Sequence, residues 1–428
     1  MSIFGLILSI VMGVHSAIPQ LQHVIIIMQE NRSFDEYFGT YPGANGIPKS
    51  GGHFTICDPD PKTGGCDYSF HDTSDKNLGG PHDTTNEIAD IDGNKFDGFV
   101  RQAFTQNQVP QNVMGYHDNT EIPNYWAYAQ QYVLHDAMFA PSTSFTGPQH
   151  MFMVSGWSAK CTVLNQPTSC KNGYQKNGNV PGSFAWTDIT YLLHKASVPW
   201  KYYVFSGHSA DVINPAEDGG TRGIYVQQNA QTANLFSPLP DFTTVIADGE
   251  LGNIVDGPTF YTDATNGTLP AVSWVVATDV LSEHPPQSVH KGMQYVTGLV
   301  NAVMASPNWS TTAIFIAWDD WGGFFDHVKP TKVDWAGYGI RVPSLVVSPW
   351  AKHNVVDHQQ LSFDAYNRLI EDLFLGGQRL DPTTDGRFDP RPDVRENYPG
   401  LGNLLNDFSF SQSPQPRMIL RDAFIVPR

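Results

Sequence analysis

The sequence has little positive charge for its length. Its 428 residues include 25 Lys and Arg against 42 Asp and Glu, which gives a formal net charge of −17, and no basic run is long enough to follow a phosphate backbone. This balance argues against nucleic acid as a partner. Anionic lipid surfaces are also expected to repel the chain, whereas zwitterionic headgroups are not.

The sequence also offers little apolar length for a membrane span. The apolar stretch at residues 1–17 is too short to cross a bilayer, so stable membrane insertion is not expected. The stretch resembles a secretory signal with small residues at Ser16 and Ala17, but it has no positive N-terminal region. A mis-assigned start or a buried first strand is the alternative. We expect a signal peptide at residues 1–17 and a secreted or periplasmic protein.

Cysteine is scarce, and its spacing is informative. The four cysteines form two local pairs, each bracketing a polar loop that contains proline: Cys57 with Cys66, and Cys161 with Cys170. Two local disulfides would fit an oxidising compartment. A zinc site of four cysteines is the alternative, which the lack of a Cys-x-x-Cys motif disfavours.

What the chain does contain is apolar runs that end in polar residues. The run at residues 24–28 has no polar alternation, which is typical of a strand buried on both faces of a parallel sheet. Glu30 and Asn31 follow it, where such sheets bind ligands. A carboxylate and an amide suit a divalent cation or a phosphoryl oxygen. A simple surface turn is the alternative.

A second apolar run, at residues 313–318, ends in the adjacent carboxylates Asp319 and Asp320. Two neighbouring carboxylates repel each other unless a cation or a shared proton offsets the repulsion. A metal ion is the simplest remedy, and Gly322 and Gly323 would let the backbone turn sharply beside it. A solvated acidic turn is the alternative.

A helix start is predicted near Thr146. Pro148 suits the first helical turn, which leaves Thr146 near the N-cap, beside free N–H groups and the positive end of the helix dipole. That position favours both an anionic nucleophile and a phosphate. The alternative is that one of four hydroxyls merely caps the helix: Ser142, Thr143, Ser144 or Thr146.

Five motifs in chain order resemble the bacterial phosphoesterase family that contains phospholipase C and acid phosphatase. They are residues 30–35, 146–150, 282–285, 319–328 and 339–343, and the resemblance runs from about His23 to Phe374. It implies an alkaline-phosphatase-like α/β fold, a three-layer sandwich with a mainly parallel central sheet and long loop insertions. We expect one phosphoesterase catalytic domain at residues 18–428.

The resemblance also implies roles for particular residues. Thr146 would be the nucleophile and would become transiently phosphorylated. The metal ligands would be Glu30, Asn31, Asp319, Asp320 and Thr146, with Asn31 also binding substrate. His82 and His284 match the family's active-site histidines and could donate to phosphate oxygens or protonate a leaving alkoxide.

Three other histidines have weaker support. His208 follows the strand-like run at residues 200–205 and is a candidate for substrate binding, while His327 is a candidate for a supporting role. Many relatives read Thr-x-Pro-Asn-Arg where this chain has Thr146-Gly-Pro-Gln-His150. Any phosphate contact made by the family's Arg is therefore absent or passes to His150.

The resulting hypothesis is a phosphoric ester hydrolase of phospholipase C or acid phosphatase type that acts through a metal-assisted phosphothreonine. The metal could be calcium, magnesium, manganese or zinc. The sequence leaves open a phospholipid or a small phosphomonoester substrate, and the oligomeric state. A sulfatase-like hydrolase is one alternative, although the usual Cys-x-Pro-x-Arg motif is absent. A non-catalytic secreted binding protein with a structural cation site is the other.

The remaining pattern predicts where helices, strands and insertions lie. Helices are expected at residues 122–132, 188–195 and 286–306, and Ser362 is expected to cap a helix that runs through Leu373. Further buried strands are expected at residues 271–276 and 342–347. The turn-rich segments 39–80 and 209–240 are expected to wall the active site.

Overall fold

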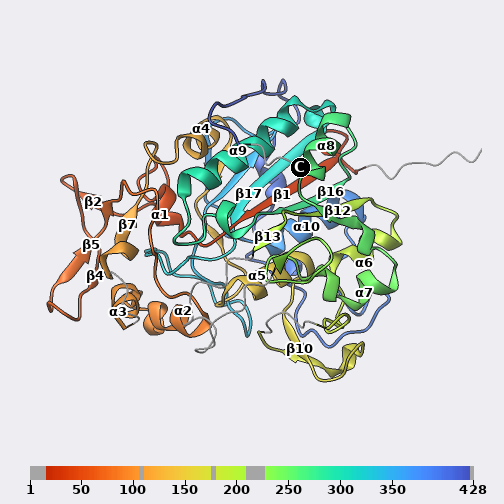
Figure 1. Cartoon of the computed structure of the whole chain (residues 1–428), viewed down its shortest axis with the longest axis horizontal. Coiled ribbons are helices and arrows are strands. Elements are labelled where there is room, and N and C mark those ends of the chain that lie inside the picture. The colour runs from red at the N-terminus through yellow and green to blue at the C-terminus, as the bar shows by residue number, and fades with distance from the viewer. Residues whose placement is uncertain (1–15, 106–109, 175–179, 209–226, 425–428) are drawn as a thin grey trace, which may run out of the picture.

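A computed structural model of the whole chain describes residues 16–105, 110–174, 180–208 and 227–424 (Figure 1). An eight-stranded sheet crosses the molecule in the order β15–β12–β16–β1–β17–β18–β8–β19. In that order the strands are Ile254–Asp256, Trp200–Val204, Val272–Val276, His23–Gln29, Thr312–Trp318, Ser344–Val347, Val133–His135 and Val355–Asp357. Of these strands, β18 alone is antiparallel to its neighbours. The prediction of a mainly parallel central sheet is confirmed.

The centre of the sheet is formed by the apolar runs that the sequence shows. In β1, residues Val24 to Ile27 have no exposed surface, and every residue of β17 is buried. Ile26 lies between Trp274 of β16 and Phe315 of β17. A fully buried side chain of this size contributes about 1.5–3 kcal/mol through the area it removes from water. The strands that position the site are therefore among the most strongly held parts of the chain.

Helices cover both faces of the sheet. Figure 1 shows α8 (Thr259–Asn266) and α9 (Val289–Ala305) on one side, and α5 (Thr146–Ser155), α6 (Ile189–Lys195) and α10 (Asp364–Phe374) on the other. Consistent with these layers, α9 packs on α4 (Pro123–Gln131) and α8, whereas α5 packs on α6 and α10. The predicted helices at residues 122–132, 188–195 and 286–306 are α4, α6 and α9.

Shorter elements lie around these layers. The other helices are α1 (Phe34–Phe38), α2 (Thr84–Ile91), α3 (Phe99–Thr105) and α7 (Thr243–Ala247). The small paired strands are β2 (Lys49–Ser50) with β3 (His53–Phe54), β4 (Cys57–Pro59) with β5 (Cys66–Tyr68), β6 (Phe70–His71) with β7 (Gly115–Tyr116), β9 (Met138–Phe139) with β20 (Leu361–Ser362), β10 (Ala159–Cys161) with β11 (Cys170–Asn172), and β13 (Gly207–His208) with β14 (Gln227–Gln228). In the described part of the chain, no helix combines the length and apolar composition needed to cross a membrane.

One local expectation needs correction. Ser362 does not cap α10: the N-cap is Phe363, which makes no side-chain cap, and the Ser362 hydroxyl instead donates to Asp364 Oδ2 at 3.0 Å. A carboxylate in the first helical turn competes with the backbone for that hydroxyl. The buried strand predicted at residues 342–347 is confirmed as β18, which runs antiparallel to both of its neighbours.

The two predicted insertions differ in how much of them is described. The hairpins of residues 39–80 lie at the left edge of Figure 1, and the end of this segment reaches the site, where the Gly80 N–H donates to the Gly322 carbonyl at 3.0 Å. Most of the segment 209–240, and nearly all of the expected signal peptide at residues 1–17, lie outside the described residues.

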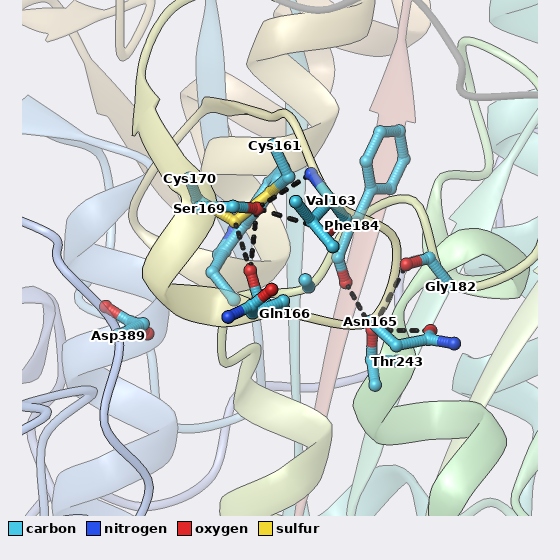
Figure 2. The surroundings of a disulfide bond; sticks show 12 residues. Cys161, Val163, Asn165, Gln166, Ser169, Cys170, Gly182, Phe184, Thr243 and Asp389 are labelled. Atoms are coloured by element: carbon cyan, nitrogen blue, oxygen red, sulfur yellow. Dashed lines mark hydrogen bonds between the residues drawn. A yellow bond between two sulfur atoms is a disulfide. The ribbon is translucent and has the colours of Figure 1, made fainter.

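Both predicted disulfides are present, Cys57–Cys66 between β4 and β5 and Cys161–Cys170 between β10 and β11. No cysteine is free, which excludes the four-cysteine zinc site. Figure 2 shows that the second bridge closes a loop organised by Ser169, whose hydroxyl accepts from the Val163 N–H at 3.0 Å and lies 2.8 Å from the Gln166 carbonyl.

Candidate active site

The ends of β1 and β17 bring four of the predicted residues together. These strands are parallel neighbours, with Gln29 opposite Trp318, so that Glu30 and Asp319 leave the sheet at the same edge. The Asp319 N–H donates to the Gln29 carbonyl at 3.1 Å, and the Asn31 N–H donates to Asp319 Oδ1 at 3.0 Å. The side chains of Glu30, Asp319 and Asp320, which we call the carboxylate cluster, are at most 1% exposed.

Asn31 and the glycine turn after Asp320 fit closely against each other. Asn31 has φ 54°, a left-handed conformation that Asn tolerates better than most residues. The Gly322 N–H donates to Asp320 Oδ1 at 2.9 Å. At Gly322, with φ 63°, a Cβ atom would lie 2.3 Å from the Asn31 carbonyl oxygen, so only glycine fits there.

Thr146 lies at the start of α5 and faces this cluster. Its Oγ1 is 3.3 Å from Glu30 Oε2 and 3.5 Å from Asp320 Oδ2. The N-cap of α5 is Phe145, and no side chain among the described residues caps the helix, so the capping alternative is wrong for all four hydroxyls. Instead, Ser142 binds Gln149 Oε1 at 2.9 Å and Ser144 binds the Thr84 hydroxyl at 2.8 Å.

The chemistry of the donor set fits a divalent cation. Asn31 Oδ1 and Asp319 Oδ2 are buried and have no hydrogen-bond partner among the described residues. Burial raises the pKa of Asp319, and the hydrogen bond from the Asn31 N–H partly offsets this rise. Buried acceptors without donors are costly, and a hard cation bound by carboxylate and amide oxygens would satisfy them.

His82 and His284 form a pair whose segments bond to the backbone of the site: the Gly80 N–H donates to the Gly322 carbonyl at 3.0 Å, and the Glu30 N–H donates to the Ser282 carbonyl at 2.9 Å. Their Nε2 atoms are 3.2 Å apart, and each Nδ1 lies 2.7 Å from a backbone carbonyl, of Gly80 for His82 and of Pro285 for His284. Because a carbonyl only accepts, each Nδ1 carries hydrogen, and the Nε2 contact is a hydrogen bond only when one ring holds a second proton. The arrangement can therefore store a proton. The His82 ring also packs edge-on against Trp321, next to Asp320.

Sequence reasoning missed the carboxylate that supports His284. Glu283 is fully buried, and its side chain accepts from Tyr125 Oη at 2.5 Å, Tyr37 Oη at 2.6 Å and Trp318 Nε1 at 3.0 Å. Its backbone carbonyl accepts from the Arg32 guanidinium at 3.0 and 2.5 Å. These contacts fix the backbone that presents His284. The Ser282–Pro285 motif was the available signal, but the aromatic partners come from distant segments.

His327 belongs to a separate ion pair network. Arg341 Nε lies 2.9 Å from Asp326 Oδ1 and Arg341 Nη2 lies 3.0 Å from Asp35 Oδ1, while His327 Nδ1 lies 2.6 Å from Asp35 Oδ2. We call these four residues the Arg341 network. Burial opposes a charged imidazole at His327, but the hydrogen bond and charge of Asp35 outweigh it and raise the pKa of His327. The network ties three of the sequence motifs together.

Of the two remaining candidate histidines, His150 contacts the carboxylate cluster, whereas the side chain of His208 is not described. His150 reaches the carboxylate cluster, with Nε2 3.2 Å from Glu30 Oε1, and burial lowers its pKa to about 3. Ligand atoms of Glu30, His150 and Asp319 lie within 4.8 Å of one another. The backbone of His208 lies in β13, but its side chain is outside the described part of the chain, and its role in substrate binding stays a prediction.

The fold and the site together define the class of protein. It is an α/β protein in which two central strands end in carboxylates and an amide at one edge of the sheet, and a hydroxyl at the start of a helix faces them. A family model described as the Phosphoesterase family matches residues 21–375. The chain belongs to the Phosphoesterase family. The resemblance found in the sequence is confirmed, as is, at the level of the family, the prediction of a phosphate-ester hydrolase.

Individual relatives are phospholipases C. The chain is 29% identical over 407 residues to a non-hemolytic phospholipase C of Burkholderia pseudomallei, covering 83% of this chain and 55% of that protein. It is 25% identical over 447 residues to phospholipase C B of Mycobacterium tuberculosis (strain H37Rv), covering 93% and 80%. The chain thus spans about half the length of the Burkholderia relative.

Matches among solved structures are more distant in sequence. A protein in the alkaline phosphatase superfamily from Vibrio parahaemolyticus is 12% identical with a TM-score of 0.37, covering 89% of this chain and 72% of that one. Ps i-CgsB in complex with k-i-k-neocarrahexaose is 10% identical with a TM-score of 0.41, covering 86% and 75%.

Proposed function

We propose that this protein hydrolyses phosphoric esters in two displacement steps through a phosphothreonine at Thr146. The observation that carries the proposal is the Thr146 hydroxyl at the start of α5, 3.3 Å from a Glu30 oxygen and 3.5 Å from an Asp320 oxygen. A hydroxyl so placed has carboxylates to take its proton, and the positive end of the α5 dipole to stabilise negative charge on the incoming phosphoryl group.

Glu30, Asn31, Asp319 and Asp320, together with Thr146, would hold a divalent cation. When bound, the cation would lower the pKa of the hydroxyl and neutralise charge on the phosphoryl group. The buried oxygens Asn31 Oδ1 and Asp319 Oδ2, which have no hydrogen-bond partner in the part of the chain that the structure describes, support this assignment.

In the first step, Thr146 Oγ1 forms a bond to phosphorus while its proton passes to a carboxylate of Glu30 or Asp320. The bond from phosphorus to the leaving oxygen breaks, and the leaving alkoxide takes the proton held between His82 and His284. In the second step, a water oxygen bonds to phosphorus and gives a proton back to the His82–His284 pair, while the bond from phosphorus to Thr146 breaks. The threonine oxygen takes back its proton from the carboxylate of Glu30 or Asp320, and the phosphate product leaves.

The substrate we propose is a phosphodiester of phospholipase C type with a zwitterionic headgroup, and the metal-assisted site also suits a small phosphomonoester. The names of the relatives support the first choice. The net charge of −17 supports a neutral rather than an anionic lipid surface. The two disulfides support export to an oxidising compartment.

One assay tests the proposal. Purified protein is incubated with phosphatidylcholine, a soluble phosphodiester, a phosphomonoester and a sulfate ester, each with a divalent cation and with excess chelator. We expect cation-dependent release of product from a phosphate ester and a phosphorylated Thr146 in acid-quenched samples. Release from the sulfate ester alone would indicate the sulfatase-like alternative, and no release from any ester would indicate a binding protein.

A further inference from the structure

His150 and Thr146 lie on one face of α5 and both contact the Glu30 carboxylate. They are four residues apart, which places their side chains one helical turn from each other. Thr146 Oγ1 lies 3.3 Å from Glu30 Oε2, and His150 Nε2 lies 3.2 Å from Glu30 Oε1. The imidazole is therefore part of the same cluster, at the position where many relatives of the resembled family carry Arg.

The surroundings of the ring decide which nitrogen carries hydrogen. The Tyr202 hydroxyl donates its single proton to the Phe236 carbonyl at 2.5 Å, so toward His150 Nδ1, 3.5 Å away, it can only accept. Nδ1 therefore carries hydrogen, and in the neutral ring Nε2 directs a lone pair at the Glu30 carboxylate.

Two acceptors 3.2 Å apart repel each other unless a positive charge lies between them. Ligand atoms of Glu30, His150 and Asp319 lie within 4.8 Å of one another. Atoms that share one ion at about 2.1 Å are up to about 4.2 Å apart, so small side-chain shifts close the cluster on an ion. A metal-binding histidine normally donates its other ring N–H to a protein acceptor, as Nδ1 does here.

We propose that His150 is a nitrogen ligand of the cation held by Glu30 and Asp319, and that it makes this site prefer Zn²⁺ over Ca²⁺ or Mg²⁺. The inference rests on the cation site of the proposed function, not on the reaction. Imidazole favours first-row transition ions, whereas an all-oxygen site suits the harder ions.

Direct metal binding tests the proposal. The full chain is freed of metal, and the affinities for Zn²⁺, Ca²⁺ and Mg²⁺ are measured by calorimetry for the wild type and for His150→Gln, which replaces the nitrogen donor with an amide oxygen. We expect His150→Gln to weaken Zn²⁺ binding at least about tenfold and to leave Ca²⁺ and Mg²⁺ binding within about twofold. X-ray absorption at the zinc edge should show imidazole scattering in the wild type that is lost in the variant.

Two further variants protect the test against a folding artefact. Tyr202→Phe keeps the ring shape and the His150 side chain but removes the hydroxyl near Nδ1, and it should weaken Zn²⁺ binding selectively by a smaller factor. His117→Gln alters another buried histidine, whose Nδ1 lies 2.8 Å from the Asp72 carbonyl, and should leave all three affinities unchanged.

The outcomes separate this inference from the proposed function. An unchanged ratio of Zn²⁺ to Ca²⁺ affinity in His150→Gln, or a zinc spectrum without imidazole, overturns the inference and means that Nε2 only donates to Glu30, whether or not esters are hydrolysed. Selective loss of Zn²⁺ binding in a protein that hydrolyses no ester supports the inference and overturns the proposed function.

Discussion

The carboxylate cluster and the Arg341 network are both buried groups of acidic side chains, but their charges are balanced in different ways. In the Arg341 network, the guanidinium binds Asp326 and Asp35 directly, at 2.9 and 3.0 Å. In the cluster, Asp319 Oδ2 and the adjacent Asn31 Oδ1 have no hydrogen-bond partner among the described residues. The difference indicates that the network is complete within the protein, whereas the cluster is arranged for a ligand.

The largest expected effect is on catalytic turnover, and it tests whether the carboxylate cluster is a reactive site. Thr146→Val removes the hydroxyl and nearly preserves volume, so the fold should persist while turnover falls by about 10⁴-fold or more, as for deleted nucleophiles elsewhere. Product release from the best ester and the melting temperature are measured together. Turnover near the wild-type level in this variant would rule out a phosphothreonine mechanism.

The next largest effect should be on the free energy of unfolding. Removing a charge should destabilise the protein in the Arg341 network and stabilise the metal-free protein in the carboxylate cluster. Arg341→Met leaves Asp326 and Asp35 buried without their cation, which is expected to cost about 3–5 kcal/mol of unfolding free energy. Asp319→Asn removes a buried charge whose pKa burial raises, and should stabilise the metal-free protein while abolishing cation-dependent hydrolysis.

Urea unfolding of metal-free samples gives both free energies. Adding a divalent cation should stabilise the wild type and should have little effect on Asp319→Asn. If Asp319→Asn destabilises the metal-free protein as strongly as Arg341→Met does, the cluster is a structural charge group like the network, and the comparison fails.

The sequence predicted most of the features that depend on the edge of a parallel sheet. The apolar runs before Glu30 and Asp319 mark central strands, and parallel neighbours end at the same edge, so the proximity of these residues followed from pattern alone. The local pairing of the four cysteines was predictable for a similar reason, since each pair closes a short loop.

Features that depend on segments distant in sequence were not predictable. The Glu283 carboxylate accepts hydrogen bonds from Tyr37, Tyr125 and Trp318, whose spacing in sequence has no regular pattern. The position of His150 was within reach, because its four-residue spacing from Thr146 on a predicted helix places both on one face. The orientation of the ring depends on Tyr202 and Phe236, which only the fold brings near.

A third, smaller effect concerns pH and the Arg341 network. Because the folded pKa of His327 is raised above 6.5, the stabilisation from its pairing with Asp35 is fully present below pH 6.5 and is lost as pH rises through the folded value. The free energy of unfolding of the wild type should therefore exceed that of His327→Gln most at acidic pH. Chemical denaturation of both proteins between about pH 5.5 and about pH 9, which lie below and above the usual histidine pKa of about 6.5, measures this difference. A difference that grows with pH would show that His327 is neutral in the network.

The smallest expected effect separates Thr146 from its neighbour. The Ser144 hydroxyl binds the Thr84 hydroxyl at 2.8 Å, joining the loop before α5 to the start of α2. Ser144→Ala should cost about 1 kcal/mol of unfolding free energy, the net value of one hydrogen bond. Turnover should stay at the wild-type level, because this hydroxyl points to α2 and not to the carboxylate cluster. Thermal unfolding and the same ester assay are measured on one preparation. Should Ser144→Ala lose turnover while Thr146→Val keeps it, the nucleophile is Ser144, and the contacts of Thr146 with Glu30 and Asp320 would serve only to hold the cluster.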